Sequence, residues 1–149
     1  MATVSVRYIV NDVDAAIEFY CGELGFNEDM HPAPSFAMLS RGDLRLALSA
    51  PGAGPGGGGG QSMPDGTRPA PGGWNRFQLE VSDLAATVER LRKRGARFRS
   101  DIIEGVGGNQ VLVEDPSGNP VELFEPKRPD AAPSTNNGRR PANSRRLDP

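Results

Sequence analysis

One carboxylate is a candidate for chemistry because of the stretch that holds it, Asp115 to Phe124. In this stretch a turn rich in Pro, Ser, Gly and Asn follows a β-branched, alternating segment and precedes a second one. The returning segment places Val121 and Leu123 on one face and Glu122 and Phe124 on the other. The stretch therefore predicts a hairpin with a carboxylate opposite its apolar face, and the neighbours of Glu122 decide the function.

A second polar face follows Trp74. Apolar and polar residues alternate there, with Phe77, Leu79 and Val81 on one side and Arg76, Gln78 and Glu80 on the other. Two further reactive residue types occur once each. Cys21 has no Cys or His near it and is interpreted as a small helix residue, and His31 is interpreted as a surface residue of a Pro-flanked loop.

The elements that position these side chains begin with a clean alternation over residues 4–10, which predicts a strand. Asp12 is a good helix N-cap, and the helical pattern that follows ends at Gly25. Residues 35–40 and 44–49 read as two more strands, and a short strand before Pro32 is left open. Residues 4–50 thus form a strand, a helix and at least two strands.

The same order returns after the middle of the chain. Asp83 caps a helix that ends at Gly95, a strand is expected over 98–103, and the opening hairpin completes the unit. At an offset of 71 residues Asp12 matches Asp83 and Ile17 matches Val88. The chain therefore consists of two strand-helix-strand-strand-strand modules, 4–50 and 74–126, in a single domain over residues 1–126.

Composition sets the outer limits. A chain of 149 residues with 36% hydrophobic residues has room for one core, and it lacks a stretch of about 20 apolar residues that could span a bilayer. Its first residues do not resemble a signal peptide, so we expect a cytoplasmic protein without a membrane partner. Residues 1–126 carry a formal charge of −6, which argues against a nucleic-acid-binding core.

Two segments have little to bury. Residues 51–73, with five consecutive glycines, are expected to be a flexible connection, and the alternative of a phosphate-binding loop lacks the Gly-Lys-Ser/Thr that such loops carry. Residues 127–149 hold six basic and two acidic residues and are expected to be a disordered basic tail. Its paired arginines could touch nucleic acid, but a solvated tail is the favoured explanation, and we expect no nucleic-acid partner.

Two sets of motifs resemble the vicinal oxygen chelate superfamily, which includes glyoxalase I, extradiol dioxygenases and bleomycin-resistance proteins. The first set is Val10-Asn11-Asp12, Phe19-Tyr20 and Leu24-Gly25-Phe26, and the second is the segment from Asp115 to Pro126. The resemblance implies an α+β fold in which two βαβββ modules form an eight-stranded mixed sheet curled around a cleft, with the helices on its outer face.

The resemblance also implies a divalent metal held by the first and last strand of each module, at Ser5, Ala47, Arg76 and Glu122 in this chain. Only Glu122 is a conventional ligand, because Ala47 has no donor, Ser5 is a poor one and Arg76 is a cation. We therefore expect an Arg76–Glu122 ion pair in a metal-free cleft without a cofactor. The alternative is that both are solvated residues of the sheet face.

The resemblance then implies a protein that sequesters an antibiotic or another bulky organic ligand, as a homodimer. The residues expected to line the ligand site are Ser5, Arg7, Phe36, Met38, Arg45, Ala47, Trp74, Arg76, Gln78, Glu80, Glu122 and Phe124. Each can instead be plain surface or core, and the face of Phe36 and Met38 is undecided. A metal-dependent lyase or dioxygenase, a metal-free enzyme that uses Glu122 or Glu80 as a base, and an interaction module that uses the basic tail remain as alternatives.

Overall fold

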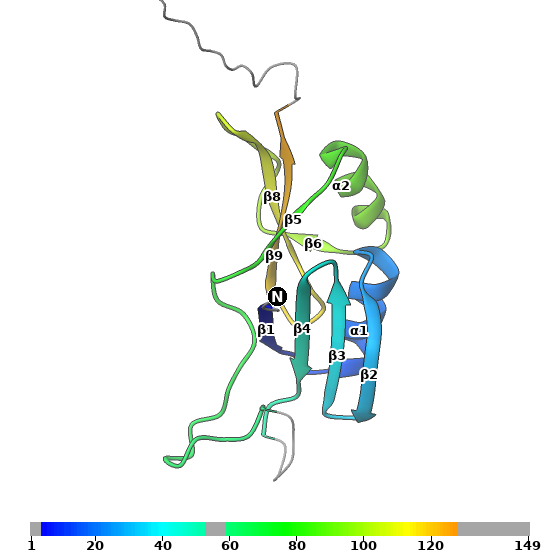
Figure 1. Ribbon diagram of the computed structural model, residues 1–149. Helices are drawn as coiled ribbons and strands as arrows, with labels where there is room; N and C mark the ends of the chain where they lie inside the picture. The colour runs from blue at the N-terminus through cyan, green and yellow to red at the C-terminus, as the bar shows by residue number, and fades with distance from the viewer. Residues whose placement is uncertain (1–3, 53–58, 128–149) are drawn as a thin grey trace, which may run out of the picture.

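Two β-sheets, each covered by one helix, make up the computed structural model, which describes residues 4–52 and 59–127 (Figure 1). The first module contains β1 (Val4–Ile9), α1 (Val13–Glu23), β2 (Asn27–Ala33), β3 (Phe36–Arg41) and β4 (Leu44–Ser49). The second contains β5 (Gln78–Glu80), α2 (Leu84–Lys93), β6 (Arg97–Phe98), β7 (Ile103–Glu104), β8 (Gly108–Glu114) and β9 (Pro120–Pro126). The α+β class is as predicted, whereas the second module has one strand more than the four expected.

The first sheet has the strand order β1-β4-β3-β2, with β1 parallel to β4 and the other pairs antiparallel. Leu46 and Leu48 of β4 are fully buried on the side of α1, as the alternation predicts. The strand left open before Pro32 forms as β2 and runs through that proline. The sequence hides β2 because Pro is rare in strands, yet an edge strand such as β2 tolerates it.

The second sheet has the order β5-β9-β8-β6, and β7 also pairs with β8. The strand expected over 98–103 is wrong, because the structure forms two short strands, β6 and β7, on either side of Arg99 and Ser100. Arg99 still donates its backbone amide to Leu112 O on β8 at 3.0 Å, while its guanidinium binds the carbonyl groups of Gly73 and Gly118. In the described residues, the strands therefore number nine and lie in two sheets rather than eight in one.

Both helices begin and end where the sequence predicts. The carboxylate of Asp12 accepts a hydrogen bond from Ala15 N, and that of Asp83 accepts one from Ala86 N, each at 3.0 Å. Gly25 and Gly95 follow the helix ends with φ of 76° and 88°, the left-handed region that glycine adopts without strain.

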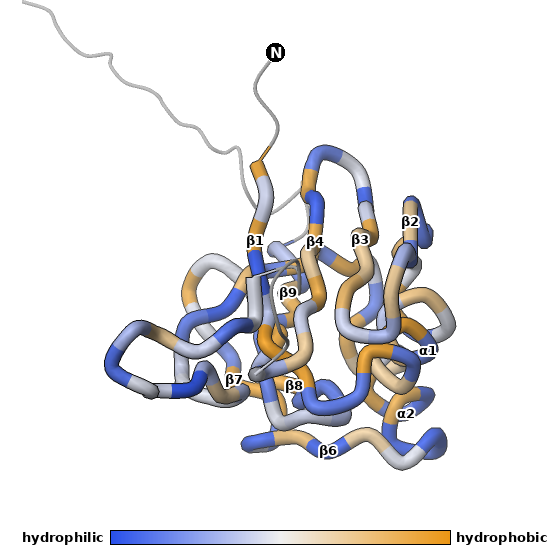
Figure 2. Tube along the Cα trace, turned by 90° about the horizontal axis from the view of Figure 1, so that it is seen from below, coloured by the Kyte–Doolittle hydropathy of each residue, from blue (hydrophilic) through white to orange (hydrophobic). Residues whose placement is uncertain are grey.

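The turn of the last hairpin holds the two modules together. Asp115 in this turn accepts a hydrogen bond of 2.8 Å from the hydroxyl of Tyr20 on α1, and Pro120 O accepts one of 2.7 Å from Tyr8 on β1. Asn119 Nδ2 donates to Ile9 O at 2.8 Å. Buried residues of both modules accordingly form one core (Figure 2).

The connection between the modules is described from residue 59 onward. Met63 and Thr67 close a turn in it, and Gly72 N donates to Asn119 Oδ1 at 2.7 Å just before the second module. Residues 53–58 and 128–149, on which part of the predicted connection and nearly all of the predicted tail fall, lie outside the described residues. Among the helices of the described part, none is long and apolar enough to cross a membrane.

Candidate functional site

Glu122 lies in the middle of β9, and 9% of its surface is exposed. Both of its carboxylate oxygens have partners: Arg76 Nε lies 3.1 Å from Oε1, and Gln78 Nε2 lies 2.7 Å from Oε2. The Arg76–Glu122 ion pair expected from the sequence therefore forms. Because the carboxylate is nearly buried, these two partners offset the cost of removing it from water.

The strand register explains why two partners converge on one carboxylate. Gln78 is the direct neighbour of Glu122 across the β5–β9 ladder, and Arg76 precedes Gln78 by two residues on the same side of the chain. Arg76 Nη1 also donates to Trp74 O at 3.2 Å, which ties the guanidinium to its own backbone. Gln78 was expected on this face, but its bond to Glu122 depends on a register that the sequence does not reveal.

Trp74 lies just before this cluster and is 68% exposed. The guanidinium of Arg99 stacks over the indole at 4.6 Å from the ring centroid. Arg99 is itself held by Glu114 at 2.9 Å, Gly73 O at 2.7 Å and Gly118 O at 2.9 Å. Arg99 thus holds the exposed ring of Trp74 in one orientation. Of the residues in this stack, the sequence analysis singled out Trp74 but not Arg99 or Glu114.

The remaining predicted residues of the second module share the face of Glu122. Phe124 is the neighbour of Glu80 across one ladder and of Gln110 across the other, and Leu112 is the neighbour of Glu122 on the β8 side. Gln110 and Leu112 were missed because only the pairing of β8 with β9 brings them beside the carboxylate. Alternation along β8 was the one signal that could have indicated them.

The predicted residues of the first module share one face of the first sheet. The register pairs Ala47 with both Arg7 and Met38, and Arg45 with Ser5. Phe36, the neighbour of Ser49, lies on this face too, so register decides the orientation of Phe36 and Met38 that the sequence left undecided. Ala47 is only 3% exposed, whereas Ser5 and Arg7 are exposed.

Two cavities in the described part of the chain are formed by other residues than these. A cavity of about 410 Å³ lies on the helix side, between α1 and the second module, and one of about 190 Å³ lies beside Gly108 and Lys127. None of the twelve predicted ligand-binding residues lines either of them. In the described residues, hydrogen-bonded strand pairing does not join the two sheets.

The two single-copy residues have structural settings of their own. His31 lies on the edge strand β2 rather than in a loop, with Nε2 at 3.6 Å from Asp14 and Nδ1 at 3.9 Å from Glu28. Its Nε2 is buried without a hydrogen-bond partner. Cys21 is half-buried on α1, where burial raises the pKa of its thiol, so the interpretation as a helix residue fits its position.

Comparison with known proteins places this architecture in a family. The family model for the glyoxalase/bleomycin resistance protein/dioxygenase superfamily matches residues 3–123. The chain belongs to this superfamily. Sequences of curated proteins provide no match.

Solved structures of the superfamily share the fold. A member from Sphaerobacter thermophilus is 26% identical, with a TM-score of 0.65 over 84% of this chain and 97% of that one. Lactoylglutathione lyase from Agrobacterium tumefaciens is 21% identical, with a TM-score of 0.62 and coverage of 83% and 92%. The bleomycin-binding protein of Streptomyces verticillus, solved with copper(II)-bleomycin, is 22% identical, with a TM-score of 0.55 and coverage of 85% and 98%.

The donor groups of this chain do not fit the divalent metal that the superfamily implies. Of the four positions carried over from the family, Ala47 has no donor atom and Arg76 holds Glu122 with its own cationic group. The neighbour of Ala47 across β1 is another cation, Arg7. Among residues 4–52 and 59–127, His, Cys, Asp and Glu side chains nowhere gather in threes that could hold a metal ion.

Proposed function

We propose that this superfamily member binds a bulky organic ligand without a metal and holds it against the sheet face that carries Glu122. One observation carries the proposal. Both oxygens of Glu122, the one conventional ligand at the family's metal positions, are already bonded to Arg76 and Gln78. A divalent ion would have to displace a guanidinium from a nearly buried carboxylate and would gain at most two protein ligands, fewer than such ions need.

The groups around Glu122 suit an organic ligand that is polar and partly conjugated. Trp74 offers the exposed part of its ring for stacking, and Phe124 lies half-buried on the same face. Arg76 offers a planar guanidinium whose Nη2 has no partner among the described residues, and such a group forms forked hydrogen bonds with anionic or carbonyl oxygens. Aromatic area and fixed donors together can grip a ligand without coordination.

The proposed binding site is completed by a second copy of the chain, so the protein acts as a homodimer. The supporting observation is that Trp74 is 68% exposed and Glu80 is exposed in one chain, while small-molecule sites usually bury most of their ligand. Light scattering on the purified protein should give twice the mass of one chain. A monomer that nevertheless binds ligand tightly would refute this part of the proposal.

The first test is elemental analysis of the purified, undialysed protein together with a bleomycin titration. We expect less than stoichiometric transition metal, and binding of bleomycin that a chelator does not change and that leads to no turnover. Because Trp74 is the only tryptophan of the chain, quenching of its fluorescence reports occupancy. About one equivalent of a transition metal per chain, lost together with binding on chelation, would overturn the proposal.

Matched variants locate the site. Glu122→Gln removes the charge that holds Arg76 and should weaken bleomycin binding by about tenfold. Glu104→Gln, an exposed acid on β7 without a predicted role, is the control and should leave binding unchanged. Equal affinity in the two variants would remove Glu122 from the site.

A second candidate is an enzyme, which the pairing of Gln78 with Glu122 favours. An amide and a carboxylate side by side are oxygen donors that a metal could use if Gln78 turned its amide around. A metal-free enzyme would use a carboxylate as a base. Glu80 suits this role better than Glu122, because Glu80 is exposed whereas both oxygens of Glu122 are hydrogen-bonded. Activity lost on chelation would support the metal enzyme, and chelator-resistant turnover abolished by Glu80→Gln would support the base.

A further inference from the structure

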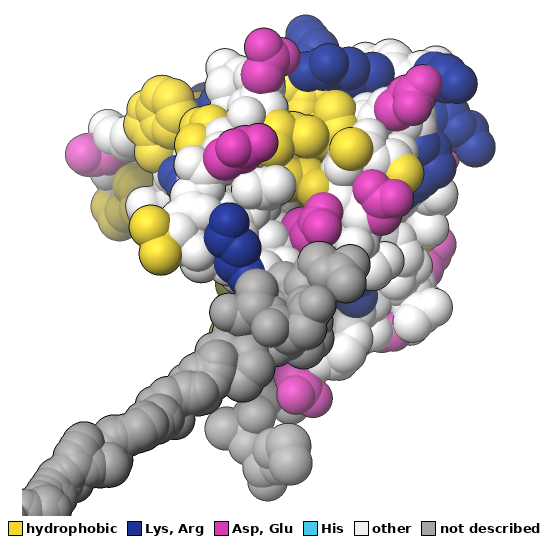
Figure 3. Space-filling model, turned by 90° about the horizontal axis from the view of Figure 1, so that it is seen from above, with side chains coloured by type: hydrophobic (Ala, Val, Ile, Leu, Met, Phe, Trp, Pro, Cys, Tyr) yellow, Lys and Arg dark blue, Asp and Glu magenta, His cyan; other side chains and the backbone are white. Residues whose placement is uncertain are grey.

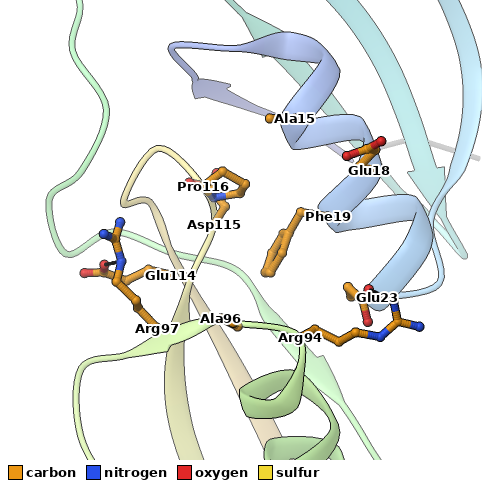
Figure 4. Close-up of a pocket in the computed structure, with 11 residues that line it drawn as sticks. Ala15, Glu18, Phe19, Glu23, Arg94, Ala96, Arg97, Glu114, Asp115 and Pro116 are labelled. Carbon is orange, nitrogen blue, oxygen red and sulfur yellow. Dashed lines mark ion pairs between the residues drawn. The ribbon is translucent and has the colours of Figure 1, made fainter.

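A cavity of about 410 Å³ lies between the two modules and is lined by none of the residues of the proposed ligand site (Figure 4). Neither module forms it alone: α1 contributes one wall, and the end of α2 with the start of β6 and the hairpin turn contributes the other. Its volume lies within the range of small-molecule sites, which often form where two structural units meet. The superfamily fold and the proposed function leave this cavity without a role.

The floor of the cavity is apolar and rigid. Phe19 points from α1 toward Ala96 across the cavity, with Pro116 at the side (Figure 4). The Phe19 ring packs edge-on against Tyr20, with ring centroids 5.1 Å apart, and Tyr20 is fixed by its bond to Asp115. An apolar group of a ligand would therefore meet a surface that needs no rearrangement.

Two arginines at the rim are only loosely engaged. Arg94 Nη1 lies 3.5 Å from Glu23, whose closer partner is Arg90 at 3.1 Å. The side chain of Arg94 is 67% exposed, and Arg90, Arg92 and Lys93 in the last turn of α2 add further positive charge. Figure 3 shows Lys and Arg side chains gathered toward the upper right of the visible face. The two carboxylate oxygens of Glu23 have different partners, Oε1 with Arg90 and Oε2 with Arg94, and the long Arg94 contact leaves this exposed guanidinium accessible to an anion.

Arg97 repeats this arrangement on the other wall. Its Nε lies 3.6 Å from Glu114, whose closer partner is Arg99 at 2.9 Å, and its side chain is 69% exposed. Arg94 and Arg97 therefore flank the cavity as exposed cations, each in a long ion pair with one oxygen of a carboxylate whose other oxygen binds a closer arginine.

The acidic residues of the cavity differ in what they can offer a ligand. Asp115 is 1% exposed, and its oxygens accept hydrogen bonds from Tyr20, Ser117 and Asn119, so it cannot reach a ligand. Glu18 is exposed, and among the described residues it has no ion-pair or hydrogen-bond partner. Glu23 and Glu114 also line the cavity, but their side chains are only 15% and 22% exposed and each is bound to two arginines. The most accessible groups are thus two guanidiniums, the carboxylate of Glu18 and an apolar floor.

We propose that this cavity is a second binding site, for a zwitterionic small molecule of the amino-acid type with a large apolar side group. The carboxylate of the ligand meets Arg97 or Arg94, its ammonium group meets Glu18, and its side group lies on Phe19. This site is independent of the sheet face that carries Glu122.

L-Phenylalanine is a suitable probe, and saturation-transfer NMR on the full chain measures its binding. N-acetyl-L-phenylalanine lacks the ammonium group and phenethylamine lacks the carboxylate, so each should bind at least about tenfold more weakly. No binding of L-phenylalanine at millimolar concentration would overturn the proposal. Equal binding of all three probes would overturn it too, because the charged rim would then have no role.

Variants test the location. Ala96→Leu fills the cavity and should abolish binding, and Arg97→Gln should weaken it by about tenfold while Arg99 still satisfies Glu114. Arg92→Gln, at the end of α2 and paired with Asp101 outside the cavity, is the control. Because Ala96→Leu could unfold the chain, its thermal unfolding is measured in parallel, and Arg97→Gln provides the second variant.

The two proposed sites can be tested separately, because different variants should affect each of them. Arg76→Gln and Glu122→Gln should leave L-phenylalanine binding unchanged, and Arg97→Gln should leave bleomycin binding unchanged. Binding of L-phenylalanine that Glu122→Gln removes and Arg97→Gln does not would overturn the second site and assign the probe to the sheet face.

Discussion

The two modules share an order of elements but differ in what their sheet faces carry at equivalent positions. Where the second module has Gln78 beside Glu122, the first has Arg7 beside Ala47. One face is thus polar and internally paired at its centre, and the other has a nearly buried alanine there. The repeated backbone therefore provides equivalent cross-strand positions in both modules, and the chemistry of each face depends on the side chains that occupy them.

The hairpin turns of the two modules differ even more. The turn between β3 and β4, with Gly42 and Asp43, is exposed. The turn between β8 and β9 is buried around Asp115 and Asn119, which also bond to the other module and to the connection. Only one of two equivalent turns has become the point at which the molecule is assembled.

The largest effect on stability is expected from replacing Asp115, the buried residue that distinguishes the second turn from the first. Asp115→Ala leaves the hydroxyl of Tyr20 and the amides of Ser117 and Asn119 without their acceptor in a buried site, at a cost of about 3–5 kcal/mol in the free energy of unfolding. Urea unfolding measures it. Asp43→Ala in the exposed turn should change stability by less than about 0.5 kcal/mol, and similar values for both variants would contradict the comparison.

The tyrosines that the second turn holds make stability depend on pH at the alkaline end. Burial raises the pKa of Tyr8 from 10.0 to about 12, and burial and Asp115 raise the pKa of Tyr20 well above its ordinary value. The unfolded chain loses these protons from about pH 10 upward while the folded protein keeps them, so stability is complete below pH 10 and falls as the pH rises toward 12. Each retained proton contributes a slope of about 1.4 kcal/mol per pH unit.

Thermal unfolding between pH 8 and 12 checks this dependence. Tyr8→Phe should make the decline shallower, because one of the two phenols no longer titrates. An unchanged decline in Tyr8→Phe would show that Tyr8 ionises alike in the folded and unfolded chain.

A smaller effect is expected at Arg99, which has no counterpart contact in the first module. Arg99→Gln removes the stack on Trp74 and the bonds to Gly73 and Gly118, which should lower stability by about 1–3 kcal/mol. Acrylamide should then quench Trp74 fluorescence more strongly, because the ring loses its fixed cover. Quenching that equals wild type, with wild-type stability, would mean that the stack does not hold the ring.

The smallest effect tests where the modules are alike. Asp12→Ala and Asp83→Ala each remove an N-cap whose hydrogen bond is 3.0 Å long, so each should lower the free energy of unfolding by about 1 kcal/mol. Chemical unfolding of both variants should give equal losses. A clear inequality would show that the two helices contribute unequally despite matching caps.

Local sequence patterns predicted most of the fold. They predicted less of the site, because the site depends on which strands pair and in which register. The caps Asp12 and Asp83 and the alternation along β4 follow from short-range geometry, so they were found correctly. β2 was left open because a proline obscures an edge strand, and the strand over 98–103 was wrong because only residues 97–98 and 103–104 pair with β8 as strands. The Arg76–Glu122 pair was expected through the resemblance, whereas Gln78 as its third member needed the register.

The sequence by itself determined the repeated modules, the helix ends and the side of each strand that faces the core, because these depend on residues a few positions apart. Only the tertiary structure decided that Asp115 joins the modules, that Gln78 meets Glu122 and that a cavity forms over Phe19. Each of these contacts brings together residues far apart along the chain. Their geometry depends on how the two sheets and helices pack, and no local pattern of residues specifies that packing.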